Sequence, residues 1–121
     1  MSIQVTSDGE GLYILSSPDQ SQWVEQVDLA GAIREAVAGK TLRGLILDLD
    51  GVSFINSAGL GAIFALRRYA AEAGARVVVS RPMLTILRLL NTVNLPELIP
   101  VTSTLEEARL ALAAAAPAAE S

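Results

Sequence analysis

The sequence contains neither cysteine nor histidine among its 121 residues. Without cysteine, the chain cannot form disulfides, thiolate nucleophiles or zinc sites built on thiolates. Without histidine, it lacks the side chain that most often serves as a general base or a metal ligand, and every Ser-His-Asp arrangement is excluded. We therefore predict a protein that is not an enzyme and that holds no metal ion and no cofactor.

Clustered basic residues and long apolar runs are also missing. The 9 lysine and arginine residues are outnumbered by 13 acidic ones, which gives a formal net charge of −4 and argues against a nucleic-acid surface. No basic segment precedes a long apolar one near the N-terminus, and the Ala-rich C-terminal segment carries Glu106, Glu107 and Arg109 at its start and Pro117 inside it. We therefore expect a cytoplasmic protein that neither binds nucleic acid nor inserts into a membrane.

The sequence is rich in aliphatic residues. Hydrophobic residues make up 51% of it and aromatic residues only 4%, so the core should be built mainly from leucine, isoleucine, valine and alanine. A chain of 121 residues has the size of one domain. We place that domain at residues 1–112 and predict that the Ala-rich tail, residues 113–121, is disordered.

Short β-prone apolar runs alternate along the chain with stretches of helical periodicity. They predict strands at 3–6, 12–16, 45–50, 75–80 and 98–101, and helices at 22–38, at 57–73, from Pro82 to near Asn91, and from Thr104 onward. The order β-β-α-β-α-β-α-β-α indicates an α/β fold with a single mixed, mostly parallel sheet and about four helices. Its first two strands should form an antiparallel hairpin.

Several residues predict how the helices end and pack. Gly39 and Gly74 are expected to stop the first two helices, and Thr104 with Glu107 three residues later is a capping-box pattern for the last one. In the third helix, the buried stripe is predicted to consist of Leu84, Leu87 and Leu90.

The most informative stretch is L-I-L-D-L-D-G-V-S-F-I-N-S-A-G-L-G, residues 45–61. A buried strand ends within it, and Asn56 or Ser57 then caps a helix. The first turn of a helix has unpaired N–H groups and the positive end of the helix dipole, so an anion such as phosphate can be held at Ser57. The small residues that follow leave the approach to the serine hydroxyl open.

At these residues the sequence resembles a known family. F-I-N-S-A-G-L-G after L-I-L-D-L-D-G-V is similar to the signature of STAS domains, in particular the anti-sigma factor antagonists, whose usual form is Asp-Ser-Ser-Gly-Leu-Gly. The resemblance implies the STAS fold from about Leu12 to about Ala108. It also implies that a partner anti-sigma factor with serine-kinase activity phosphorylates Ser57, and that only the unphosphorylated form binds this partner and frees the sigma factor. A phosphatase is a further partner of such a switch.

The resemblance also implies which residues meet the partner: Asn56, Ser57, Ala58, Gly59, Leu60, Gly61 and Asp19. Two departures from the family pattern bear on this set. Asn56 stands where the family has an acidic residue, which keeps the hydrogen-bonding shape but removes the charge. The family's Gly-x-Leu-Asp loop is not recognisable at residues 16–20, so a second acidic contact can be assigned only to Asp19.

A second function stays open, in which the domain is an accessory STAS subunit of a transport or sensory assembly. The same surface would then dock permanently, and Asn56 would be tolerated because no phosphoryl group is transferred. If the family's acidic residue orients the serine for transfer, asparagine should slow phosphorylation. If that residue serves mainly as a helix cap, asparagine does this equally well.

Two other candidate sites have simpler explanations. Asp48 and Asp50 could bind Mg²⁺ at a strand end, but such a site also needs another acidic residue and a lysine near a later strand end, and Lys40 is the only lysine. Solvated or hydrogen-bonded carboxylates are favoured instead. Ser57 as a hydrolase nucleophile would lack both the first glycine of the Gly-x-Ser-x-Gly elbow and a histidine.

Two further groups of residues could contribute to a docking surface. Arg67 and Arg68 should lie on the exposed side of their helix, as a solvated or partner-facing patch rather than a phosphate site. Pro18, Trp23 and Val24 lie near the expected open end of the sheet, where a structural role is equally compatible with the sequence.

Overall fold

The computed structural model describes residues 4–9, 11–16 and 29–114. The elements follow the predicted order: β1 (Gln4–Ser7), β2 (Leu12–Ser16), α1 (Leu29–Val37), β3 (Gly44–Asp48), α2 (Ser57–Glu72), β4 (Arg76–Ser80), α3 (Leu84–Thr92), the 3₁₀ helix η1 (Leu95–Glu97), β5 (Val101–Thr102) and α4 (Leu105–Ala114). Residues 22–28 of the first predicted helix and 115–121 of the predicted tail lie outside the described ranges. Ala113 and Ala114, which we assigned to the tail, belong to α4.

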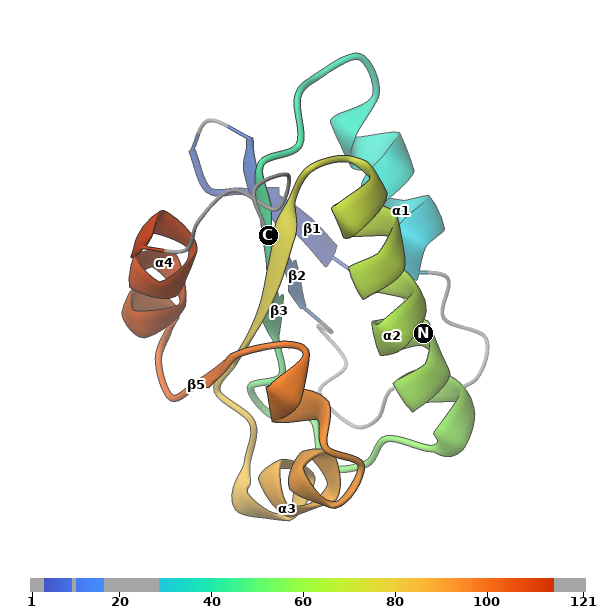
Figure 1. Ribbon diagram of the computed structural model, residues 1–121, viewed down its shortest axis with the longest axis vertical. Helices are drawn as coiled ribbons and strands as arrows, with labels where there is room; N and C mark the ends of the chain where they lie inside the picture. Colours follow the sequence, from blue (N-terminus) through green and yellow to red (C-terminus); the bar gives the residue numbers. More distant parts are fainter. Residues whose placement is uncertain (1–3, 10, 17–28, 115–121) are drawn as a thin grey trace.

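The five strands form one sheet in the order β1-β2-β3-β4-β5. β1 pairs antiparallel with β2 and the other pairs are parallel, which confirms the prediction of a mixed, mostly parallel α/β sheet. Figure 1 shows α1 and α2 on one face of the sheet, α4 on the other, and α3 beyond the ends of β3 and β4. Because parallel strands end at the same edge, the connections that follow β3 and β4 lie at one end of the molecule.

Alternate residues of β3 face two hydrophobic cores of unequal size. Leu45 and Leu47 belong to the larger core, which lies between the sheet and the helices α1 and α2. Ile46 belongs to the smaller core under α4, together with Val78 and Ala108. All of β3 is buried, as expected for a central strand whose two faces are both covered by helices.

A last short strand is present as predicted, but its predicted bounds, 98–101, are wrong. The chain first forms η1, and β5 is limited to two residues that pair with the end of β4. Pro96 lies in the first turn of η1, where its missing N–H costs nothing. Pro100 has no N–H to donate to a sheet ladder, which keeps the strand from starting earlier. Ile99 is buried without belonging to a strand, so its apolar character reflects packing alone.

The predicted buried stripe of α3 is wrong at Leu84. This side chain is 60% exposed, whereas Ile86 and Leu90 are buried and Leu87 is half-buried. Residues four apart share one helix face, and at 3.6 residues per turn Leu84 lies about 160° around the axis from Ile86. The helix also begins at Leu84 rather than at Pro82.

The predicted helix ends are confirmed. Gly39 and Gly74 follow α1 and α2 with left-handed φ angles of 76° and 78°. Before α4, the N–H of Glu107 donates to Oγ1 of Thr104 at 3.0 Å, and the Glu107 carboxylate accepts a hydrogen bond from the N–H of Ser103 at 2.9 Å. Within the described ranges, no helix combines the length and apolar character needed to cross a membrane.

Candidate functional site

The connection between β3 and α2 carries the chain from the sheet to the predicted site. Gly51 turns it with a φ of 79°, a conformation that favours glycine. Val52 and Ile55 are buried in the larger core, and the N–H of Val52 donates to the carbonyl of Leu49 at 3.0 Å. The connection is therefore anchored at two points, which fixes the position of the residue after Ile55.

Asn56 is the cap of α2. Its backbone is extended, and its Oδ1 accepts a hydrogen bond from the N–H of Gly59 at 2.7 Å. Its carbonyl accepts the first helical hydrogen bond from the N–H of Leu60 at 3.0 Å. The side chain thus satisfies one of the unpaired donors of the first turn without adding a charge to it.

Ser57 is the first residue of α2, and its side chain is exposed. Because Asn56 provides the N-terminal cap, the serine hydroxyl is not needed to cap the start of the helix. Ala58 and Gly61 are exposed beside it. Apart from the adjacent residues and backbone of α2 itself, none of the described residues lies within 4 Å of the place where a side chain at Gly61 would begin. The open approach predicted for this hydroxyl is therefore present.

The remaining motif residues hold the first turn in place. Gly59 is buried, and Leu60 packs half-buried against the larger core. The structure thus gathers the six predicted residues from Asn56 to Gly61 in one exposed turn whose inner side is anchored. Asp19, the seventh, lies outside the described residues, as do Pro18, Trp23 and Val24.

A partly buried ion pair, which the sequence did not reveal, lies where β3 ends. The side chain of Asp48 is 8% exposed, and its Oδ2 accepts a hydrogen bond from Nη2 of Arg81 at 2.6 Å. Its Oδ1 accepts hydrogen bonds from Nε of Arg81 and from the N–H of Asp50, both at 3.1 Å. The hydrogen bonds to Asp48 raise the pKa of Arg81 above its ordinary value. The pair ties the β3–α2 connection to the one that follows β4.

Arg81 also holds the chain through its backbone. Its φ of 58° is left-handed, which is uncommon for a residue with a side chain, and its N–H donates to the carbonyl of Thr102 in β5 at 3.0 Å. The only sequence signal for this pair was position: Asp48 ends one strand, and Arg81 directly follows the next strand along the chain. The expectation that Asp48 is a hydrogen-bonded carboxylate is confirmed, because the guanidinium contacts both of its oxygens. No group of three side chains suited to holding a metal ion occurs among the described residues.

Exposed apolar side chains are found at the same end of the sheet. Phe54 in the β3–α2 connection is 51% exposed, and Met83 and Leu84 after β4 are 39% and 60% exposed. The ion pair between Arg81 and Asp48 links the two connections that carry them. Exposed apolar residues that gather near one another are a common feature of protein-binding surfaces.

The arginine pair of α2 is exposed, as predicted, but lies far from Ser57. Arg67 is ten positions further along the helix, which corresponds to about 15 Å at 1.5 Å per residue. Its Nε donates to the carbonyl of Leu98 at 3.3 Å. Arg67 and Arg68 are therefore too distant to pair with a phosphate on Ser57.

Comparison with known proteins gives a consistent result. A family model described as STAS domain matches residues 24–108. A STAS domain protein from Planctomyces limnophilus, described as an anti-sigma-factor antagonist, is similar in structure with a TM-score of 0.74. It is 25% identical in sequence, and the match covers 91% of this chain and 96% of that one.

Two solved structures with lower sequence identity share the fold. The Bacillus cell fate determinant SpoIIAA, in its phosphorylated form, matches with a TM-score of 0.62 and 17% identity over 89% of this chain and 96% of that one. The murine anion transporter Slc26a9 matches with a TM-score of 0.70 and 16% identity, over 90% of this chain but only 19% of the transporter. The same fold thus occurs both as a small separate protein and as part of a large transporter.

Proposed function

The chain belongs to the STAS domain family, and on this premise we propose that it is an anti-sigma factor antagonist. The unphosphorylated chain binds an anti-sigma factor with serine-kinase activity in the cytoplasm and so frees a sigma factor. That kinase ends the binding by phosphorylating Ser57, and a phosphatase restores it. The observation that carries the proposal is an exposed serine at the first position of a helix that Asn56 already caps.

The position of Ser57 suits a phosphate that must be carried without unfolding the protein. A phosphoserine has a charge of about −1.5 to −2 at pH 7. The N-terminus of α2 offers the positive end of the helix dipole, and neither Asn56 nor any residue in the first turn is acidic. The helix end therefore stabilises the phosphate locally, so phosphorylation acts on the surface and leaves the fold intact.

The surroundings of Ser57 suit a partner whose binding is opposed by the charge of a phosphate on Ser57. The partner would cover the turn from Asn56 to Gly61 and the exposed Phe54, Met83 and Leu84, with Asp19 as a further contact. A phosphate inside such an interface would have to lose its water, and no arginine of α2 is close enough to pair with it. Desolvation then opposes binding, and an acidic group of the partner would oppose it further.

The comparisons support the proposal at the level of relatives. The Planctomyces protein is described as an anti-sigma-factor antagonist and covers nearly the whole chain. SpoIIAA, also described as an anti-sigma factor antagonist, has been solved in phosphorylated and unphosphorylated forms. A protein of this fold therefore carries a phosphate without losing its structure.

One observation favours a second function, in which the domain docks permanently in a transport or sensory complex. Asn56 makes the cap without the negative charge of the family's usual residue. If that charge is needed to orient the serine during transfer, this chain is a poor kinase substrate. The Slc26a9 likeness shows that the fold also occurs within a transporter.

Intact-protein mass spectrometry tests the two functions directly. The purified chain is incubated with ATP and a candidate anti-sigma factor kinase from the same genome. We expect the mass of one phosphate to be added to the wild type and to Ser53→Ala, whose exposed serine lies in the same loop, but not to Ser57→Ala.

Binding of the same kinase completes the test. Ser57→Ala should bind as tightly as the wild type, and Ser57→Asp should bind much more weakly. Equal binding by the two variants would contradict the switch. Binding without phosphorylation would favour the permanently docked subunit.

A further inference from the structure

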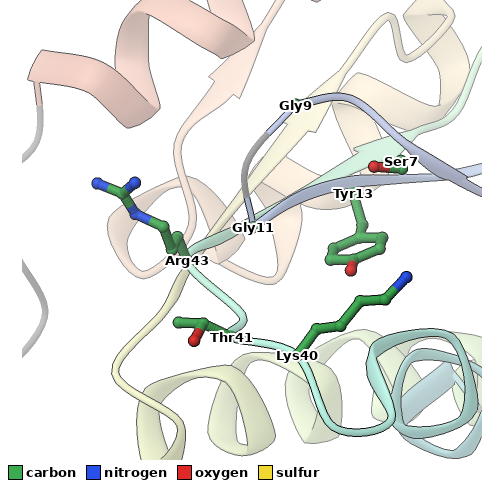
Figure 2. A pocket seen from close by; sticks show the side chains of 7 residues that line it. All are labelled: Ser7, Gly9, Gly11, Tyr13, Lys40, Thr41 and Arg43. Atoms are coloured by element: carbon green, nitrogen blue, oxygen red, sulfur yellow. The ribbon is translucent and has the colours of Figure 1, made fainter.

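A pocket of about 590 Å³ lies between the β1–β2 hairpin and the segment that leads from α1 into β3 (Figure 2). Its side chains include Ser7 and Tyr13 from the hairpin strands and Lys40, Thr41 and Arg43 from the segment before β3. This segment precedes β3, whereas Ser57 follows it, so the pocket lies at the opposite end of the sheet from the phosphorylation site.

The two walls of the pocket are fixed to each other. The carbonyl of Gly11 accepts hydrogen bonds from the N–H groups of Arg43 at 2.8 Å and Gly44 at 3.1 Å. Gly11 has a φ of 73°, and a Cβ there would lie 2.5 Å from Cγ of Arg43, so the arginine stem packs directly against the glycine backbone. Such a closely packed junction makes the pocket a preformed feature of the fold.

The charge of the pocket is opposite to that of the protein. Lys40 and Arg43 line it, and none of its described lining residues is acidic, although the whole chain has a net charge of −4. The hairpin turn carries two acids: Asp8 is paired with Arg109 of α4 at 2.7 Å, and Glu10 lies outside the described residues. A negatively charged group entering the pocket therefore meets the Lys40 ammonium group, which forms no ion pair within the described residues.

Three polar side chains of the pocket have no hydrogen-bond or ion-pair partner among the described residues. Tyr13 is 6% exposed as a whole residue, and its hydroxyl is at the accessible end of the side chain. Within the described ranges, this hydroxyl and the side chains of Lys40 and Thr41 form no hydrogen bond or ion pair. Figure 2 shows the Tyr13 hydroxyl and the Lys40 ammonium group directed toward the same space, with the Arg43 side chain extending away on the far side of Gly11. Both groups are therefore available to donate a hydrogen bond to a molecule in this space.

We propose that this pocket binds a small molecule through a carboxylate or phosphate group. Lys40 is the ionic anchor, because an ammonium group can only donate hydrogen bonds, and the Tyr13 hydroxyl donates a second one. The pocket is larger than one such group and falls within the usual range of about 300–1,000 Å³ for ligand sites, so the anionic group would be attached to a larger body. This binding is independent of the proposed phosphorylation of Ser57.

Nuclear magnetic resonance of the ¹⁵N-labelled full chain tests the proposal. Sodium phosphate and sodium acetate are titrated separately, and sodium chloride at equal ionic strength is the control. We expect saturable shifts of the amide signals of Gly11, Tyr13 and Thr41 with at least one of the two oxyanions and none that saturate with chloride. The oxyanion that binds more tightly identifies the preferred group.

Three variants distinguish this site from general attraction of anions. Lys40→Gln should abolish saturation, and Tyr13→Phe should weaken binding on the order of tenfold, because a hydrogen bond to a charged group is lost. Arg68→Gln removes the same charge from the exposed face of α2 and should bind as the wild type does. Unsaturable shifts with both oxyanions, or equal binding by Lys40→Gln and Arg68→Gln, would overturn the proposal.

Discussion

The polar side chains at the two ends of the sheet differ in whether they are hydrogen-bonded within the protein. At the carboxyl end of β3, Asp48 bonds to Arg81 and Asn56 bonds to Gly59, so these groups hold one another. At the amino end, the side chains of Tyr13 and Lys40 form no such bonds with the described residues. The first arrangement fixes a backbone that presents one free hydroxyl, Ser57. The second leaves donors in place for a group from outside the protein.

The largest loss of stability at the carboxyl end should come from breaking its ion pair. Arg81→Ala leaves the Asp48 carboxylate buried without its cation, which we expect to lower the free energy of unfolding by about 2–3 kcal/mol. The estimate is below that for a fully buried pair because the side chain of Arg81 is 38% exposed. Urea denaturation measures the change, and Arg68→Ala on the surface of α2 is the control. A loss no larger than that of the control would show that the pair does not stabilise this end.

At the amino end, the largest loss should come from the backbone rather than from a charge. Gly11→Ala forces a side chain onto a φ of 73° and places its Cβ against Arg43. We expect it to lower the free energy of unfolding by about 1–2 kcal/mol. Thermal denaturation tests this, with Lys40→Gln as a partner variant. Lys40→Gln should leave stability nearly unchanged, because that side chain forms no bond within the described structure.

Replacing Asn56, the cap of α2, should change the free energy of unfolding by a smaller amount. Two substitutions separate the effect of its hydrogen bond from the effect of an added charge. Asn56→Ala removes the acceptor of the Gly59 N–H and should cost about 1 kcal/mol. Asn56→Asp keeps the acceptor, adds a negative charge at the positive end of the helix dipole, and should gain about 0.3–1 kcal/mol. Urea denaturation gives both values. Phosphorylation of Asn56→Asp at the wild-type rate would show that the family's acidic residue acts only as a cap.

A modest effect of Gly61→Ala on stability should accompany a large effect on binding. Gly61→Ala introduces a better helix former at a position with open space around it, so we expect a gain of about 0.5–1 kcal/mol. The added methyl group lies in the proposed partner surface and should weaken binding of the anti-sigma factor. Isothermal titration calorimetry and urea denaturation on the same sample compare the two. Unchanged binding would place Gly61 outside the interface.

The sequence predicted those parts of the structure that depend on neighbouring residues. A helix cap at Asn56 or Ser57 and the helix ends at Gly39 and Gly74 each need only a few adjacent positions. Both helix ends are confirmed, and the structure assigns the cap to Asn56. The mostly parallel sheet follows from the alternation of strands and helices, which also requires only the order of local patterns.

Features that join distant parts of the chain could not be predicted in the same way. The partner of Asp48 is 33 residues away, and the composition of neither segment requires the two to meet. The pocket beside Tyr13 forms only because the hairpin and the segment before β3 lie next to each other. Leu84 has the hydrophobicity of a core residue, but the face of α3 that is buried is set by how the helix docks.

The unequal cores have a consequence for how the molecule opens. Helix α4 is held by the small core of Ile46, Val78 and Ala108 and by the ion pair between Arg109 and Asp8. The first cooperative unit to detach in the native state should therefore be α4, and its amide hydrogens should exchange with deuterium before those of α2. Since Asp8 belongs to the hairpin, each such opening also breaks the ion pair at the hairpin turn. The bonds of Gly11 to Arg43 and Gly44 and the turn that carries Ser57 are left in place.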